Sequence, residues 1–123
     1  MFEITVKTDF SSAHNLRGYN GKCEEIHGHN FKVSVTVSGE KLDDIGLVID
    51  FKILKEKANK IISRLDHKYL NNLSEFTKIN PSSENIAKYI FKEMDKELKG
   101  ENAKIKRVVV WESDSSCATY YED

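Results

Sequence analysis

Alternation of apolar and polar residues along two stretches is the feature of this sequence that most constrains its fold. The side chains of residues 31–37 alternate between Phe or Val and a polar residue, and the run ends at Gly39. Residues 2–10 alternate in the same way and lead toward His14. Because successive side chains of a strand point to opposite faces, both stretches predict strands with one buried face. With the polar residues 15–26 between them, they predict a long antiparallel pair.

Two later segments have the period of an amphipathic helix. Apolar residues recur every three or four positions from Phe51 to about Leu65, and Asp50 stands before them as the expected N-cap. A second run of this kind begins after Ser82, a further expected N-cap, and Gly100 is expected to stop it. The sequence therefore predicts two helices in the middle of the chain.

Three more segments are apolar enough to be strands. Residues 47–49 predict a short strand, and residues 105–111 and 117–121 predict two more, joined by a Ser-Asp-Ser turn. Strands and helices that occur in separate runs indicate an α+β domain, an antiparallel sheet with both helices on one face. The other face then meets solvent or is covered by another subunit. A chain of 123 residues without a linker or repeat predicts one domain spanning residues 1–123.

Composition narrows the classes of partner. The net charge is −1 with both signs mixed along the chain, so we expect no nucleic-acid partner. No apolar run approaches the roughly 20 residues of a membrane span, so we expect no membrane partner. The first residues have neither the basic region nor the apolar region of a secretory signal peptide. A small secreted protein usually has more than the two cysteines of this chain. The cytoplasm is the expected location.

Three of the four histidines stand near the ends of the two long predicted strands. His27 and His29 are two positions apart, so on a strand both imidazoles point to the same face. His14 on the neighbouring strand supplies a third imidazole. Three protein ligands with one open position are typical of catalytic zinc. The alternative interpretation is a set of surface histidines without a metal.

The two cysteines receive different interpretations. Cys23 lies in a polar loop beside a lysine, where a lowered pKa would make its thiol a nucleophile or a base. The alternative is a small buried side chain. Cys117 lies in the last predicted strand, and we expect it to pack. A redox or metal sensor that uses both thiols is a further hypothesis.

Two acidic sites could take part in chemistry. Asp66 and His67 form either a solvated helix end or a pair for proton transfer. Glu112 follows a very apolar strand, where its carboxylate either reaches solvent or accepts two parallel hydrogen bonds from a guanidine-like edge. Each signal is weak when taken alone.

Taken together, these residues resemble the 6-pyruvoyl-tetrahydropterin synthase family. That family includes the prokaryotic 6-carboxy-tetrahydropterin synthase of queuosine and deazapurine biosynthesis. The resemblance covers nearly the whole chain and agrees in order and spacing. Its motifs are FSSAH at residues 10–14, CxxxHGH at 23–29, VIDF at 48–51, LDH at 65–67, PSSEN at 81–85 and WES at 111–113.

The resemblance implies a role for each candidate residue. It implies zinc (Zn2+) ligands at His14, His27 and His29, a catalytic triad of Cys23, Asp66 and His67, and a pterin anchor at Glu112. It also implies the tunnelling fold, a four-stranded antiparallel sheet with two helices on one face. In that family trimers close their sheets into a barrel, two trimers stack as a homohexamer, and active sites lie between subunits.

The resemblance further implies a substrate and a set of possible products. The substrate is 7,8-dihydroneopterin triphosphate, and the expected product is 6-carboxy-5,6,7,8-tetrahydropterin, released with acetaldehyde and triphosphate. One alternative product is 6-pyruvoyl-tetrahydropterin. Because Glu24 directly follows Cys23, another is 6-hydroxymethyl-7,8-dihydropterin, made by a dual-function enzyme in which Glu24 joins Glu112 as a substrate-binding residue. The alternative role of Glu24 is a solvated loop charge, and the non-enzymatic alternative is a zinc-bearing pterin-binding module.

Overall fold

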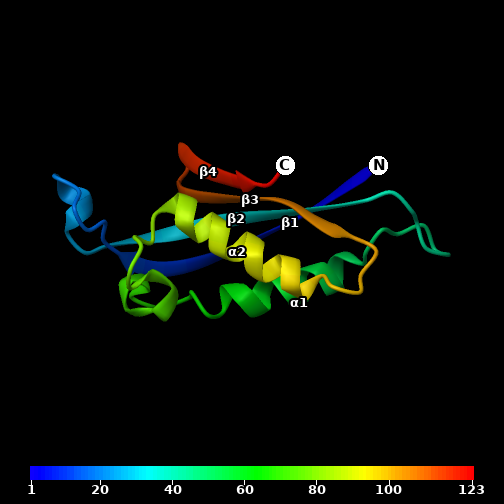
Figure 1. The fold of residues 1–123 in the computed structure, drawn as a ribbon, viewed down its shortest axis with the longest axis horizontal. Coiled ribbons are helices and arrows are strands. Elements are labelled where there is room, and N and C mark those ends of the chain that lie inside the picture. Colours follow the sequence, from blue (N-terminus) through cyan, green and yellow to red (C-terminus); the bar gives the residue numbers. More distant parts are fainter.

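The fold is a four-stranded antiparallel sheet with the strand order β1-β2-β3-β4. A computed structural model describes the backbone of residues 1–123 and every side chain except that of Lys22. The strands are β1 (Phe2–His14), β2 (His27–Gly39), β3 (Lys104–Ser113) and β4 (Ser116–Tyr121). β1 and β2 pair over their whole length and span the longest dimension of the molecule (Figure 1). The long antiparallel pair is confirmed.

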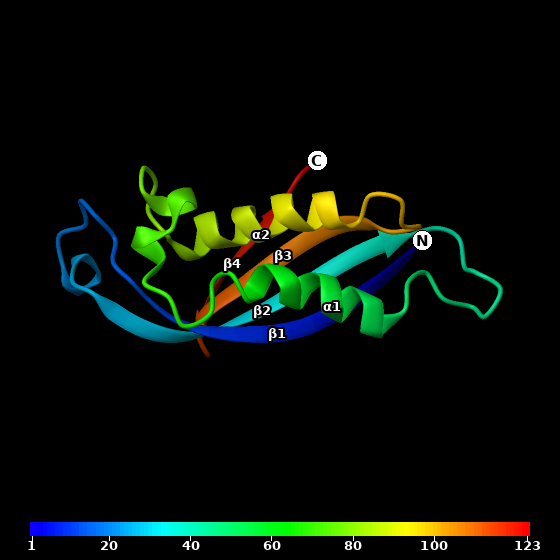
Figure 2. The same ribbon diagram turned by 90° about the horizontal axis from the view of Figure 1, so that it is seen from below.

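Both helices cover the same face of this sheet (Figure 2). α1 (Phe51–Ile62) packs against β1, and α2 (Ser83–Glu97) packs against β3 and β4. Both predicted N-caps are confirmed, because the Asp50 carboxylate accepts from the Lys52 amide and the Ser82 hydroxyl from the Asn85 amide. Three short 3-10 turns lie in the connections, at Lys22–Glu24, Leu70–Asn72 and Ser74–Phe76.

The core lies between the helices and one face of β2. Phe31, Val33, Val35 and Val37 are buried, as the alternating pattern predicts. They meet apolar residues of both helices, including Leu54, Ile61, Ile86, Ile90 and Met94. Each such side chain stabilises the fold by about 1.5–3 kcal/mol on burial. Near one end of the sheet the rings of Phe10 and Phe31 stack with centroids 4.8 Å apart, and both are part of the buried core.

The short strand predicted at residues 47–49 is absent: Leu47 has no regular structure, and Val48 and Ile49 form bends. Val48 and Ile49 are nevertheless buried. The Val48 side chain packs across the end of β2 at Gly39, where a Cβ atom would lie 2.6 Å from Val48 Cγ1. The Asp43 carboxylate accepts hydrogen bonds from the Ile45 and Leu47 amides and so shapes a turn before them. The apolar signal therefore reflected core packing without strand pairing. α1 likewise ends at Ile62, three residues before its expected limit.

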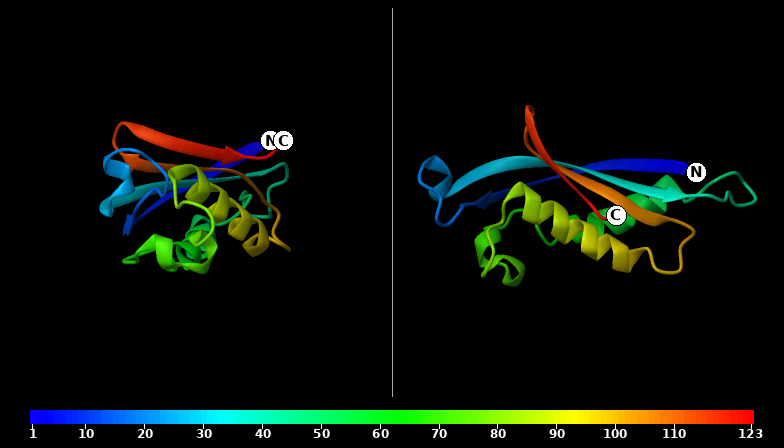
Figure 3. Two further views of the ribbon diagram at one scale, coloured as in Figure 1. Left: turned by 60° about the vertical axis from the view of Figure 1, so that its left-hand side comes forward. Right: turned by 45° about the horizontal axis from the view of Figure 1, so that its top comes forward.

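The opposite face of the sheet carries no helix, and the sheet is strongly twisted (Figure 3). β1 and β4 are its two edges. The edge of β1 is partly covered near its end, where Ala13 forms a parallel bridge with Tyr69. Neither α1 nor α2 has the length and apolar character needed to cross a bilayer.

Candidate metal centre

The three histidines converge at the end of the sheet where β1 ends and β2 begins. The strand register places His14 opposite His27 and Ser12 opposite His29. Glu112, near the end of β3, adds a carboxylate. One ligand atom from each of these four side chains lies within 4.8 Å of all the others. The structure therefore brings together the three predicted metal ligands and adds Glu112 to them.

His14 is buried and holds a fixed orientation. Its Nδ1 lies 2.7 Å from the carbonyl oxygen of Pro81. A carbonyl only accepts, so Nδ1 carries the proton and Nε2 presents a lone pair to the cluster. That Nε2 lies 3.1 Å from Glu112 Oε1 but has no hydrogen-bond partner. A lone pair facing a carboxylate oxygen is repulsive unless a proton or a cation lies between them.

The other two imidazoles are arranged in a similar way. His27 Nδ1 lies 2.8 Å from the Glu25 carbonyl oxygen, which leaves its Nε2 available to the cluster. His29 Nε2 lies 3.2 Å from Glu112 Oε1. Burial lowers the pKa of the His29 imidazole, the Glu112 carboxylate opposes this shift, and the other two imidazoles add to it. A low pKa favours the neutral imidazole that binds metals.

The donor set fits a divalent metal ion. Two nitrogens bound to one tetrahedral zinc ion at about 2.0–2.1 Å lie roughly 3.3 Å apart. Ligand atoms that lie within 4.8 Å of one another would therefore move closer by at most about 1.5 Å to bind one ion. The ring of Phe31 packs beside His14 and His29, with centroids 5.4 and 5.5 Å away, and limits their movement. Backbone carbonyls hold the outer nitrogens of His14 and His27, as expected around a metal site. The cluster can therefore hold a metal ion.

Asp66 and His67 form a separate pair at the edge of β1. Asp66 Oδ2 lies 3.0 Å from His67 Nδ1, and Oδ1 accepts from the Ser11 amide at 2.9 Å. The pKa of the Asp66 carboxyl is lowered, chiefly by that amide and further by His67. His67 has a positive φ of 55°, held by a 2.7 Å bond from its own amide to the Ser11 carbonyl. A strained conformation fixed by several bonds is typical of functional sites.

Cys23 and Glu24 lie in the 3-10 turn of the loop between His14 and His27. The Leu16 amide donates to the Cys23 carbonyl at 2.7 Å, which ties this turn to the chain two residues beyond His14. Cys23 is a free, partly buried thiol. Among the interactions of the described side chains, none joins Cys23 or the Asp66–His67 pair to the histidine cluster. Within one chain, these groups therefore lie near one end of β1, and no hydrogen bond or ion pair of the described side chains links them to the cluster.

A small pocket of about 170 Å³ adjoins Glu112. Its lining includes Glu84 in the first turn of α2 and Cys117 in β4. Cys117 is exposed, so the prediction that it packs is wrong. It lies opposite Trp111 at the edge of the sheet, next to a register irregularity, where alternation does not determine burial. Glu84, which lines this pocket, was not among the predicted site residues, although an acidic residue near a helix N-terminus was a signal in the sequence.

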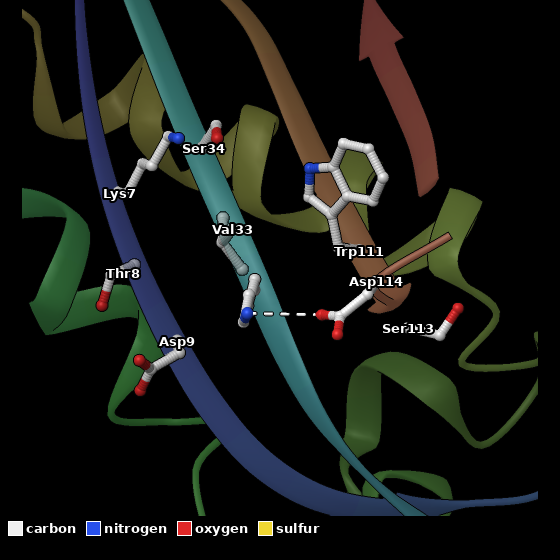
Figure 4. A pocket seen from close by; sticks show the side chains of 9 residues that line it. Lys7, Thr8, Asp9, Val33, Ser34, Trp111, Ser113 and Asp114 are labelled. Carbon is white, nitrogen blue, oxygen red and sulfur yellow. Dashed lines mark hydrogen bonds and ion pairs between the residues drawn. The ribbon is translucent and has the colours of Figure 1, made fainter. Parts of the chain in front are cut away.

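A hollow of about 360 Å³ on the open face of the sheet is distinct from this site. Figure 4 shows Trp111 and Lys7 at its sides. Lys32 Nζ lies 3.4 Å from Asp114 Oδ1, and this ion pair also lines the hollow. Its two lysines are matched by two aspartates, the second being Asp9. The charges therefore balance, and this hollow shows no preference for an ionic ligand.

Comparisons with known proteins agree with this arrangement. The family described as 6-pyruvoyl tetrahydropterin synthase matches residues 3–123. An Archaeoglobus fulgidus protein named putative 6-carboxy-5,6,7,8-tetrahydropterin synthase is 42% identical over 115 residues, which cover 94% of this chain and 91% of that protein. A Pyrococcus furiosus protein named dihydroneopterin monophosphate aldolase is 36% identical over 111 residues, 90% of each chain. The structure of Caenorhabditis elegans 6-pyruvoyl tetrahydropterin synthase has a TM-score of 0.85 and 26% identity, and covers 99% of this chain and 96% of its own. The fold, the motifs and the match over almost every residue show that this chain belongs to the 6-pyruvoyl tetrahydropterin synthase family.

Proposed function

We propose that this protein is a zinc-dependent lyase that acts on 7,8-dihydroneopterin triphosphate. The products are 6-carboxy-5,6,7,8-tetrahydropterin, acetaldehyde and triphosphate, with one water consumed, which places the enzyme in queuosine or deazapurine biosynthesis. The observation that carries the proposal is the buried, unpartnered Nε2 of His14, which faces Glu112 among two further imidazoles. The name of the Archaeoglobus fulgidus relative supports the product.

A carboxylate beside the cluster would hold the pterin ring. The ring has a guanidine-like edge whose two N–H groups match the two oxygens of a carboxylate. Glu112 lines the small pocket and is the anchor that the resemblance implies. Because its Oε1 already faces two histidines, Glu84 in the same pocket is the second candidate. Glu84 forms no ion pair among the described side chains, so its carboxylate is available.

The remaining groups would move protons. A bound zinc ion would act as a Lewis acid toward the hydroxyl groups of the substrate side chain. Cys23, as thiolate, would take a proton from that side chain and later return it. Asp66 holds the Nδ1–H of His67, which leaves Nε2 of that imidazole to carry out the opposite transfer. Loss of triphosphate and cleavage of a carbon–carbon bond would then give the 6-carboxy product.

We further propose that the active site is completed between subunits. His67 is 82% exposed by its side chain, and it lies at the edge of β1 without contact to the cluster in the described part of its own chain. The edges of β1 and β4 also offer unpaired backbone groups, which proteins commonly cover. Trimers that close their sheets into a barrel, stacked as a homohexamer, would cover both edges. Native mass spectrometry tests this, because a monomer at micromolar concentration would contradict it.

A second candidate function is aldol-type cleavage to 6-hydroxymethyl-7,8-dihydropterin. The name of the Pyrococcus furiosus relative favours it. So does the position of Glu24, which offers a second base beside Cys23 in the same 3-10 turn. A 6-pyruvoyl product and a pterin-binding module without catalysis are the remaining alternatives.

Incubation of the zinc-loaded protein with 7,8-dihydroneopterin triphosphate, followed by mass spectrometry, tests the proposal. We expect mainly the 6-carboxy product with acetaldehyde, and loss of both in Cys23→Ala. Glu24→Ala tests the second candidate, with Glu25→Ala in the same loop as its matched control. A 6-hydroxymethyl product that depends on Glu24 but not Glu25 would replace our main proposal. Binding of the substrate without any product would favour the non-catalytic module.

A further inference from the structure

The side-chain amide of Asn15, the residue after His14, connects two segments that carry proposed proton-transfer groups. Its Nδ2 donates to the Glu24 carbonyl at 3.1 Å. Its Oδ1 accepts from the Tyr69 hydroxyl. A carbonyl only accepts, so the Glu24 contact fixes the orientation of the amide and directs its oxygen to Tyr69. One amide group therefore bridges the Cys23 turn and the chain just beyond His67.

The backbone of Asn15 is held as firmly as its side chain. Its amide donates to Asn71 Oδ1 at 3.0 Å, and Asn71 Nδ2 donates back to the Asn15 carbonyl at 2.9 Å. Asn71 is buried. The loop of residues 15–26 and the segment after α1 lie at the same end of the sheet in Figures 1 and 2. Asn15 is thus fixed at the junction of both.

Backbone hydrogen bonds of the neighbouring residues join the same segments. The Ala13 amide donates to the Lys68 carbonyl at 2.9 Å, and the Leu16 amide donates to the Cys23 carbonyl at 2.7 Å. Residues on both sides of Asn15 therefore contact the same two segments. Asn15 alone contacts both among the side-chain hydrogen bonds of the described residues.

We propose that Asn15 is a positioning residue that sets the Cys23 turn relative to the Asp66–His67 pair. This inference rests on the proposed function, which gives those groups their roles. Asn15 touches no reacting atom in the proposal and acts through the Glu24 carbonyl and the Tyr69 hydroxyl. If the bridge is broken, the Cys23 turn opens more often, and the Cys23 thiol spends less time in its position relative to the Asp66–His67 pair.

Two variants break the two halves of the bridge with small changes. Asn15→Asp keeps the shape and the acceptor for Tyr69 but replaces the donor that faces the Glu24 carbonyl. Tyr69→Phe removes only the hydroxyl. Asn102→Asp is the matched control, because Asn102 Nδ2 donates to the Lys41 carbonyl at 2.7 Å near the opposite end of β2.

Two readouts separate positioning from stability. The first is the rate at which iodoacetamide alkylates Cys23, measured on the tryptic peptide of residues 23–32, which excludes Cys117. We expect it to rise about tenfold in Asn15→Asp, since loss of one hydrogen bond shifts a local opening equilibrium by that order. The second is steady-state kinetics, where we expect kcat to fall about tenfold while KM changes little, because no substrate contact is lost. Asn102→Asp should match wild type in both.

The inference is overturned if both bridge variants alkylate and turn over within about twofold of the control. It is also overturned if Asn15→Asp and Asn102→Asp raise the alkylation rate equally, since the effect would then be general destabilisation. An inactive wild-type protein would contradict the proposed function. In that case the alkylation rates still decide whether Asn15 holds the turn, so the two failures are distinguishable.

Discussion

Replacing His14 with Asn separates the structural role of this residue from its proposed metal-binding role. In His14→Asn the side-chain Nδ2 takes the place of the imidazole Nδ1, so the hydrogen bond to the Pro81 carbonyl is kept. The nitrogen that faces Glu112 is lost. The variant therefore removes one predicted zinc ligand while retaining the contact that orients the residue.

The expected effect differs between metal-free and zinc-loaded protein. In metal-free protein, the smaller side chain packs less well against Phe31, but an unpaired buried nitrogen costing about 1–3 kcal/mol is also removed. These changes offset each other, so we expect similar stability, within about 1 kcal/mol. With free zinc at about 100 times the dissociation constant, wild type gains about 2.7 kcal/mol. For a chain of this size that raises Tm by about 10 °C.

Thermal unfolding followed by circular dichroism, with chelator and with zinc, measures both effects. We expect the zinc-induced rise in Tm in wild type and little or none in His14→Asn. His67→Asn is the matched control, because His67 is exposed and outside the cluster, and it should keep the full rise. An equal rise in His14→Asn and wild type, or no rise in wild type, would refute the assignment of His14 as a ligand.

Three further predictions concern individual contacts. Asp50→Ala removes the N-cap of α1 and should lower the free energy of unfolding in urea by about 1 kcal/mol; an unchanged midpoint would contradict this. Phe31→Ala removes the ring between the core and the histidines and should cost about 3–5 kcal/mol, whereas a loss below about 1 kcal/mol would show that the ring is not structural. NMR titration should find the pKa of Asp66 below the ordinary value of about 3.9. The contribution of Asp66 to the free energy of unfolding is then fully present above the ordinary pKa and is lost as pH falls through the lowered pKa. A measured pKa at or above about 4 would show that the Ser11 amide does not hold the carboxylate.

Much of the fold and part of the site were predictable from the sequence. The alternation along β1 and β2 specifies which face is buried, and the same period of two places His27 and His29 on one face. The position of His14 opposite His27 follows once the two strands pair with Phe10 opposite Phe31, because this register places the buried positions of both strands on one face. The local alternation and the pairing of two consecutive strands were therefore sufficient for these features.

Other features depend on contacts between distant segments. Residues 47–49 are apolar because Val48 packs over Gly39, and no pattern within the segment reports that contact. Glu112 reaches the histidines only because β3 lies beside β2, about 80 residues away in the sequence. The bridge through Asn15 likewise joins the loop of residues 15–26 to the segment after α1, and no periodicity describes either.

X-ray absorption at the zinc edge, on protein purified without added metal or chelator, measures whether the histidine cluster binds zinc and through which atoms. We expect about one zinc ion per chain, bound by three imidazole nitrogens at about 2.0–2.1 Å with one or more oxygen ligands. Replacing any one of His14, His27 or His29 should lower the metal content. Zinc well below one equivalent, or a sulfur ligand at about 2.3 Å, would contradict a three-histidine catalytic centre.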